Sequence, residues 1–337
     1  MSFCRSHQLC DVIGALQLPV HVSAALAELG IANTAQLALA DIDTILAQPA
    51  VAGAGAGAQQ SERVERMQLE RLFRASLELS APRHASALDL LTLQLSFERL
   101  SSGCAQLDAL LDGGLVPGHV VELYGASGCG ASLLWHSAAL AALLRGSSVV
   151  VIDSGNGAFS AARLVALLSA AFGDASELHA EQLLSRMFVH VAVDAFAATR
   201  ALDQIASARF CDDADAVPWR GDGTAPLGLV VVDSLGALMS PLVSLSTPHA
   251  VGQGMLGQVA RQLKSIAVEN NAVVLAVNYS LHDGMPALGR AWRFVANERL
   301  LLERSPGSPH VRATLTRANS ALAGHHVEFE LTDTGLL

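Results

Sequence analysis

Residues 120–144 read VVELYGASGCGASLLWHSAALAALL. The segment begins with a short apolar run at 120–124, passes through a glycine-rich turn and continues into a longer stretch rich in alanine and leucine. A short apolar run bounded by glycine is typical of a buried strand, and the longer stretch after the turn is typical of a helix. The segment is therefore a predicted strand–turn–helix unit, the repeating unit of a parallel sheet covered by helices.

The turn in this unit has the spacing of a phosphate-binding loop, G-x-x-x-x-G-K-[ST], with one change. Gly125 and Gly130 occupy the two glycine positions, Ser132 the hydroxyl position and Ala131 the lysine position. Glycines tolerate backbone angles that other side chains forbid, so the amides can surround phosphate oxygens at the start of a helix. A glycine-rich turn without a ligand is the alternative. We predict these nucleotide-contacting residues: Gly125, Ala126, Ser127, Gly128, Cys129, Gly130, Ala131 and Ser132.

The alanine in the lysine position predicts weak nucleotide binding. A hydrogen bond to a charged group contributes roughly 1.5–3 kcal/mol, which corresponds to about one to two orders of magnitude in affinity. Phosphoryl transfer should suffer more, because the missing charge would stabilise the transition state. Lys264 is the only lysine in the chain and lies on a distant predicted helix, so no other lysine can replace it. An arginine from a neighbouring subunit could.

A second apolar run, LVVVDS at 229–234, ends in a carboxylate about a hundred residues later. In phosphate-loop proteins an aspartate at the end of such a strand holds Mg²⁺ together with the loop hydroxyl. We therefore predict ATP and Mg²⁺ as cofactors, with Ser132 and Asp233 as the metal ligands. The alternative is that Asp233 caps the next turn.

The remaining pattern predicts an α/β core preceded by helices. From Leu95 onward, apolar runs at 120–124, 148–153, 187–191, 227–233, 271–278 and 298–303 alternate with helical patterns at 130–145, 157–171, 195–209 and 250–270. Such alternation predicts a mainly parallel, twisted sheet flanked by helices. Two alternating segments at 310–318 and 325–331 predict a terminal antiparallel pair. The Asp-rich stretch 211–226 predicts an exposed loop.

The first part of the chain predicts a separate small domain. Short helical patterns at 18–48 and a charged amphipathic pattern at 61–79 surround the glycine- and alanine-rich segment AVAGAGAGAQQ at 50–60. We expect a helical N-terminal domain at 1–80 with a flexible insert at 50–60, a linker at 81–95 and the core at 96–337.

Composition limits the partners. The 337-residue chain has a formal net charge of -10, so any contact with DNA must come from a local basic patch or from partner proteins. No run reaches the roughly 20 apolar residues of a membrane span, and the start lacks the apolar core of a signal peptide. We expect a soluble, intracellular protein with no membrane partner. Its five scattered cysteines favour reduced thiols over disulfides or a zinc site.

Longer strings resemble a known family. LSFERLSSGCAQLDALLDGGLVPGHVVELYG (95–125) is similar to the entry to the ATPase core of the RecA/RadA recombinases. VIDSGNGAFSAARLVALL (151–168), LVVVDSLGALMSPLV (229–243) and PALGRAWRFVANERLLLE (286–303) resemble the D-type paralogues of the eukaryotic Rad51 recombinases. The resemblance implies a RecA-like core with a degenerate phosphate loop.

The resemblance also implies a cellular function and partner proteins. Its members are nuclear proteins that assist strand-exchange recombinases in repairing DNA breaks and stalled forks. They work in a hetero-oligomer with a C-type paralogue and the X-ray cross-complementing paralogue two, and reach single-stranded or branched DNA through that complex. The family's phosphate and Mg²⁺ contacts carry over to Gly125, Gly130, Ser132 and Asp233, but not to Ala131.

Two departures from the family pattern argue against hydrolysis by this chain alone. Active recombinases place a catalytic glutamate shortly after the strand that here ends at Asp153, whereas this chain has Ser154, Gly155 and Asn156. The polar residue that senses the γ-phosphate after the fifth strand is here represented by Asn278-Tyr279. We assign no catalytic residue.

A basic segment near the end is the candidate DNA contact. Arg290 and Arg293 flank Trp292 in a stretch that resembles the second DNA-facing loop of the recombinases, and an aromatic beside arginine suits single-strand contacts. The alternative is that Trp292 packs in the core while the arginines meet a neighbouring subunit. The segment 240–254 resembles the first such loop but has no basic residue. DNA binding by the isolated chain should be weak and sensitive to salt.

Three functions are compatible with these features. The favoured one is an assembly or mediator subunit of recombination with weak or absent ATP hydrolysis. The second is a DNA-dependent ATPase completed in trans by a partner subunit. The third is a regulator that derives from a phosphate-loop protein and acts outside recombination.

Overall fold

The computed structural model describes residues 86–337, except 156, 173–175, 208–224, 244–248, 282–283, 319–322, 333–334 and 337, together with residues 26, 31, 37, 45, 66, 67 and 69–74. The chain separates into two compact units, Met1–Leu90 and Leu91–Leu337. In the first unit the described helical positions include a set of fully buried aliphatic side chains: Leu26, Leu37, Ile45, Leu69 and Leu72. The insert at 50–60 and residues 211–224 of the predicted loop lie outside the described residues, so the predicted domain boundaries stay a prediction.

The second unit contains one twisted sheet. Its strands, in the order β3-β2-β4-β5-β1-β6-β7-β8-β9, are β1 (Val120–Gly125), β2 (Ser148–Asp153), β3 (Met187–Val191), β4 (Leu227–Asp233), β5 (Val273–Tyr279), β6 (Glu298–Arg304), β7 (His310–Arg317), β8 (His326–Thr332) and β9 (Gly335–Leu336). Strands β1 to β6 pair in parallel, and β7, β8 and β9 add to the β6 edge in antiparallel fashion. The predicted parallel core and terminal antiparallel pair are both confirmed.

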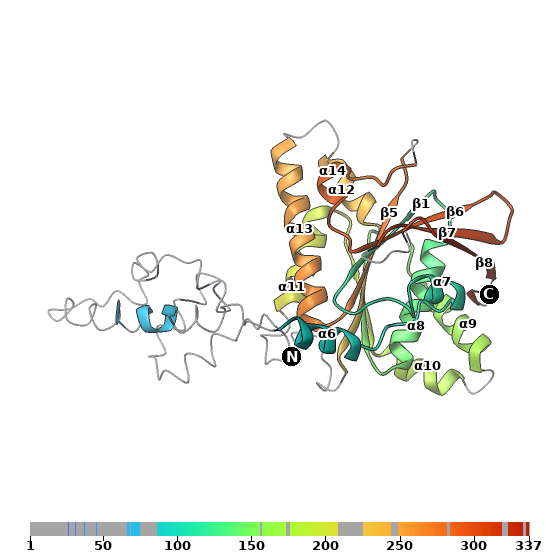
Figure 1. Ribbon diagram of the computed structural model, residues 1–337, viewed down its shortest axis with the longest axis horizontal. Helices are drawn as coiled ribbons and strands as arrows, with labels where there is room; N and C mark the ends of the chain where they lie inside the picture. The colour runs from blue at the N-terminus through green and yellow to red at the C-terminus, as the bar shows by residue number, and fades with distance from the viewer. Residues whose placement is uncertain are drawn as a thin grey trace. The chain divides into compact units, whose positions relative to one another are not determined.

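Helices cover both faces of this sheet (Figure 1). The described helices of the unit are α6 (Ala87–Ser96), α7 (Ala105–Leu110), α8 (Ala131–Leu144), α9 (Ala161–Phe172), α10 (Ser176–Leu184), α11 (Ala195–Ser207), α12 (Leu235–Val243), α13 (His249–Asn270) and α14 (Gly289–Trp292). Helices α7 to α10 pack on one face, and α11 to α14 pack on the other. Because alternate residues of each central strand enter opposite cores, those strands are mostly apolar on both faces, with the buried Glu122 of β1 and Asn278 of β5 as exceptions.

The structure adds helices that the sequence pattern did not predict. Helix α6 occupies most of the described part of the predicted linker, and α10 and α12 fall between predicted elements. Helix α12 is apolar almost throughout and contains Pro241, so it lacks the 3.6-residue polar periodicity that marks a surface helix. Within the described residues, no helix combines the length and apolar character that crossing a bilayer requires.

The strand order fixes the position of the site. β1 lies between β5 and β6, and β4 lies next to β5. Since the carboxyl ends of parallel strands meet at one edge, Gly125, Asp233 and Tyr279 are brought to the same edge although they are far apart in sequence. Ligands of open α/β sheets bind at this edge.

Candidate nucleotide-binding site

The turn from β1 into α8 has backbone conformations and close contacts that require glycine. Gly128 and Gly130 have φ values of 79° and 98°, in the left-handed region that side chains disfavour. Gly125 is required for a different reason: a Cβ there would lie 2.3 Å from the Leu302 carbonyl oxygen and 2.9 Å from Cys129 Sγ. No side chain caps the start of α8. Its first amides therefore remain available to an anion.

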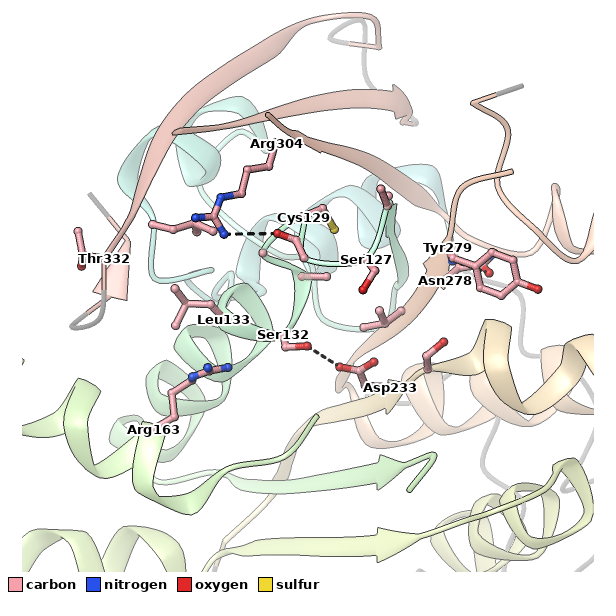
Figure 2. Close-up of a pocket in the computed structure, with 18 residues that line it drawn as sticks. Ser127, Cys129, Ser132, Leu133, Arg163, Asp233, Asn278, Tyr279, Arg304 and Thr332 are labelled. Carbon is pink, nitrogen blue, oxygen red and sulfur yellow. Dashed lines mark hydrogen bonds between the residues drawn. The ribbon is translucent and has the colours of Figure 1, made fainter. Parts of the chain in front are cut away.

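The loop hydroxyl and the β4 carboxylate meet as predicted. Ser132 Oγ donates to Asp233 Oδ2 at 3.1 Å, and Trp135 Nε1 donates to the same oxygen at 2.7 Å. Figure 2 shows the contact between Ser132 and Asp233 among the residues that line the cavity. Asp233 is buried, with 3% of its surface exposed. The sequence reading missed Trp135, because nothing in the loop motif specifies the residue that holds the aspartate from the helix side.

Asp233 is an acid that lacks a counter-ion among the described residues. Burial raises the pKa of its carboxyl group, the hydrogen bonds from Trp135 and Ser132 oppose this, and the nearby Asp153 raises the pKa further. Both hydrogen bonds fall on Oδ2, so a divalent cation could approach through Oδ1. The described residues include no group of three His, Cys, Asp or Glu side chains that could hold a metal. One carboxylate and one hydroxyl suit Mg²⁺, which usually takes its remaining ligands from phosphate and water.

The two polar residues at the end of β5 are both already engaged. The Asn278 amide nitrogen donates to Glu122 Oε1 at 2.8 Å and to the Ala287 carbonyl oxygen at 3.1 Å. Tyr279 lies at the cavity, where its hydroxyl forms a hydrogen bond with Ser240 Oγ. Neither side chain presents an unused donor to a terminal phosphate in this arrangement.

The turn after β2 contains no described carboxylate beyond the strand itself. Asp153 accepts the amides of Gly155 at 2.9 Å and Phe159 at 3.2 Å, so it closes this turn. Ser154 Oγ accepts the Ser234 amide at 3.1 Å. Asn156 lies outside the described residues. The absence of a glutamate that could activate water, and the weak ATP hydrolysis expected from it, stay predictions.

A cavity of about 560 Å³ opens over the loop. It is lined by the loop, by the ends of β4 and β5, and by four residues from elsewhere: Arg163, Arg304, Leu331 and Thr332. Figure 2 shows the two arginines reaching the loop from different elements, Arg163 from α9 and Arg304 from the end of β6. The sequence reading assigned neither arginine to the loop, because only the folded sheet brings these segments to it.

A buried histidine joins the loop helix to the segment that carries Arg163. His136 stacks on Trp135 with ring centroids 3.6 Å apart, and its Nδ1 lies 2.5 Å from the Ser132 carbonyl oxygen. Its Nε2 accepts the Ser160 amide at 3.2 Å. Burial lowers the pKa of His136 from 6.5 to about 4. The ring is therefore neutral, with Nδ1 as donor and Nε2 as acceptor.

The candidate DNA contact is partly corrected by the structure. Arg290 and Arg293 are exposed, but Trp292 is buried and donates to Glu122 Oε1 at 2.8 Å. Of the two interpretations, the structure supports the one in which Trp292 packs in the core. Whether Arg290 and Arg293 contact DNA or a neighbouring subunit stays a prediction.

Two arginines that follow this segment, Arg299 and Arg312, form ion pairs with carboxylates. Arg299 is buried and paired with Glu122, and Arg312 pairs with Glu328 at 2.7 Å. The aromatic side chain that is exposed in this segment is Phe294, at 69%, with the Arg317 guanidinium 5.7 Å from its ring centroid.

Comparison with known proteins matches residues 95–299 to the Rad51 family model. The DNA repair protein RAD51 homolog 4 of Bos taurus is 35% identical over 223 residues, and that of Mus musculus is 33% identical, also over 223 residues. In both cases the match covers 64% of this chain and 64% of the relative, so this chain spans less than two thirds of those proteins.

Archaeal proteins match as well. The DNA repair and recombination protein RadB of Thermoplasma volcanium is 27% identical over 257 residues, which cover 74% of this chain and 96% of that protein. A crystal structure of the RadB recombinase superposes with a TM-score of 0.55 at 25% identity, covering 70% of this chain and 98% of that chain. The predicted RecA-like α/β fold is confirmed.

Proposed function

Because the chain belongs to the Rad51 family, we propose that it is a recombinase-paralogue subunit that supports homologous-recombination repair of DNA breaks and stalled forks. It acts as an assembly or mediator subunit with weak or absent ATP hydrolysis. The observation that carries this proposal is the preserved contact between Ser132 and Asp233 beside a loop whose lysine position holds Ala131. The two residues that would hold Mg²⁺ are present, whereas the lysine whose charge would assist phosphoryl transfer is absent.

The cofactor in this proposal is ATP with Mg²⁺. The loop amides would surround the phosphates, while Ser132 and Asp233 would hold the metal. Bound Mg²⁺ supplies positive charge to the phosphate oxygens. The protein's own contribution is to orient the phosphates and to bury Asp233 beneath them. With no described carboxylate at Ser154 or Gly155, the bound nucleotide serves mainly to stabilise the core and its interfaces.

The partners in this proposal are other recombinase paralogues, namely a C-type paralogue and the X-ray cross-complementing paralogue two. The N-terminal unit and the segment after it hold one neighbour, and the core holds the other. The protein acts in the nucleus and reaches single-stranded or branched DNA through the complex. Support comes from relatives described as DNA repair proteins and from the net charge of -10, which disfavours DNA binding by the chain alone.

The test is to measure ATP binding and turnover by the full chain and by its complex, each with and without Asp233→Ala. We expect Mg²⁺-dependent binding that Asp233→Ala weakens, with turnover near background in every sample. Turnover that depends on Asp233 would contradict the assembly role and favour an ATPase completed in trans by a partner.

A second measurement tests the biological setting. Affinity purification of the full chain from its own cells should recover recombinase paralogues. Recovery of other proteins without any paralogue would favour a regulator outside recombination.

A further inference from the structure

We propose that Arg163 and Arg304 of the same chain supply the positive charge that the phosphate loop lacks at Ala131. The inference deepens the proposed function and rests on nucleotide binding at this site. Of the described residues that line the cavity, these two carry a positive charge. The replacement for the lysine would then come in cis rather than from a neighbouring subunit.

Arg304 is placed over the loop by the sheet register. Strand β6 runs parallel to β1 with Leu302 opposite Gly125, the first residue of the loop. Arg304 therefore stands two residues beyond the point where the loop leaves the sheet. Its Nη1 donates to the Gly128 carbonyl oxygen at 3.4 Å, and its Nε donates to the Ser308 carbonyl oxygen at 2.6 Å. Figure 2 shows the first of these contacts holding the guanidinium against the loop.

Arg163 approaches the other side of the loop from the first turn of α9. The start of this helix is tied to the loop helix, because the Ser160 amide donates to His136 Nε2 at 3.2 Å. The Ser160 hydroxyl in turn accepts the Arg163 amide at 3.3 Å. In Figure 2 the Arg163 side chain extends toward the region where Ser132 meets Asp233.

Within the part of the chain that the structure describes, no carboxylate compensates the charge of either guanidinium group. Among the described residues, neither Arg163 nor Arg304 forms an ion pair with a carboxylate, and the hydrogen-bond acceptors of Arg304 are neutral carbonyl oxygens. Arg299 and Arg312, by contrast, are paired with Glu122 and Glu328. Arginine side chains with unused donors beside a ring of loop amides suit phosphate oxygens, which accept hydrogen bonds in a forked geometry.

The positions of the two arginines assign them different phosphates. In phosphate-loop proteins Mg²⁺ bridges the β- and γ-phosphates near the loop hydroxyl and the strand aspartate. Arg163, on the side of Ser132 and Asp233, would therefore contact the γ-phosphate that only ATP has. Arg304, held at Gly128, would contact the inner phosphates that ATP and ADP share. Arg163 thus determines the preference for ATP, and Arg304 contributes equally to both nucleotides.

The test uses the full chain with Mg²⁺ and fluorescent N-methylanthraniloyl derivatives of ATP and ADP. Arg163→Gln should weaken ATP binding about tenfold and leave ADP binding within about twofold of wild type. Arg304→Gln should weaken both about tenfold. Arg200→Gln is the matched control, since Arg200 is an exposed arginine on α11 and does not line the cavity. Thermal unfolding without nucleotide checks that each variant is folded.

A second set of variants tests whether the arginines replace the lysine. Ala131→Lys should strengthen ATP binding more in the Arg163→Gln/Arg304→Gln background than in the wild-type background, because the charges serve the same phosphates. Equal gains in both backgrounds would contradict the replacement. Unchanged ATP affinity in Arg163→Gln and Arg304→Gln would also overturn the proposal that these arginines replace the lysine. The proposed function would still stand in that case, provided that the wild-type chain binds ATP.

The remaining outcomes separate the two proposals. Binding by Ala131→Lys without binding by wild type would mean that the loop is competent and the arginines do not compensate. Binding by neither protein would overturn nucleotide binding itself, and the arginine assignment with it.

Discussion

At the scale of the residue, a substitution of Ala131 is expected to change ATP binding and ATP hydrolysis to different extents. The loop amides and the contact from Ser132 to Asp233 remain, so a lysine introduced there would find the surroundings that a phosphate loop provides. We expect Ala131→Lys to strengthen ATP binding at least tenfold but to leave hydrolysis near background, because Ser154 and Gly155 provide no carboxylate to activate water. Equilibrium binding and phosphate release measure the two effects separately.

Two results for Ala131→Lys would contradict this expectation, one in ATP affinity and one in ATP turnover. No gain in affinity in the Arg163→Gln/Arg304→Gln background, where no cavity arginine can mask the lysine, would mean that the loop cannot admit phosphate, for example because Leu331 covers Gly130, where a Cβ would lie 2.7 Å from its Cδ1. A large gain in turnover would mean that a carboxylate elsewhere activates water.

His136 makes a residue-scale contribution to stability that depends on pH. Its folded pKa is lowered from 6.5 to about 4 by burial, which corresponds to about 3 kcal/mol. Between these pH values the unfolded chain takes up a proton that the folded chain does not. This contribution to the free energy of unfolding is therefore present above pH 6.5 and is lost as the pH falls toward 4.

We expect His136→Gln to flatten this dependence. Its free energy of unfolding should vary with pH by about 1.4 kcal/mol per unit less than that of wild type over this window, at a lower overall stability because the stacking on Trp135 is lost. Urea unfolding at several pH values measures the slopes. The exposed His310, changed to glutamine, serves as the control. Equal slopes for His136→Gln and wild type would show that folding does not lower the pKa of His136.

At the scale of elements, a buried network joins three strands and the segment after β5. Glu122 of β1, which is fully buried, pairs with Arg299 of β6 and accepts hydrogen bonds from Asn278 of β5 and Trp292 of α14. Because four elements meet at one carboxylate, removing a partner leaves a charge without compensation in the core. The network links the end of β5 beside the nucleotide cavity to the segment that carries Arg290 and Arg293.

This network predicts a large effect from a single substitution. Arg299→Met should lower the free energy of unfolding by about 3–5 kcal/mol, because it leaves Glu122 buried and unpaired. Arg312→Met, which breaks the exposed pair with Glu328, should change it by less than about 1 kcal/mol. Chemical unfolding of both variants makes the comparison. Similar small losses for the two would show that water reaches Glu122 when its partner is removed.

At the scale of the whole molecule, the net charge of -10 opposes DNA binding. Arg290 and Arg293 are exposed in the candidate loop, but the buried Trp292 cannot stack on bases. We expect the isolated chain to bind single-stranded DNA weakly, with affinity that falls steeply as salt rises. Each of Arg290→Gln and Arg293→Gln should reduce the salt slope by about one.

Fluorescence anisotropy with a labelled single strand at several salt concentrations measures this dependence. Arg145→Gln is a useful control, since Arg145 pairs with Glu98 far from the candidate loop in sequence. Unchanged slopes in the Arg290 and Arg293 variants would assign these two side chains to a protein interface instead.

The sequence by itself determined the sheet and the loop of this protein. Strands that are buried on both faces are mostly apolar, so the runs at 148–153 and 227–233 predicted β2 and β4 to the residue, and the short apolar run at 187–191 predicted the edge strand β3. The loop could also be predicted from the sequence, because its glycines and its hydroxyl lie in one short segment. Asp233 was predicted because an aspartate at the end of such a strand holds Mg²⁺ in phosphate-loop proteins.

Only the tertiary structure decided which distant side chains complete the site. Trp135 reaches Asp233 across 98 residues of sequence, and Arg304 reaches Gly128 across 176. Such contacts follow from the strand order, in which β6 joins β1 and β4 lies one strand further away on the other side. Local patterns record whether a residue is buried, but not which residue of another strand it will face. For the same reason the sequence could suggest that Trp292 packs in the core but not that it donates to Glu122.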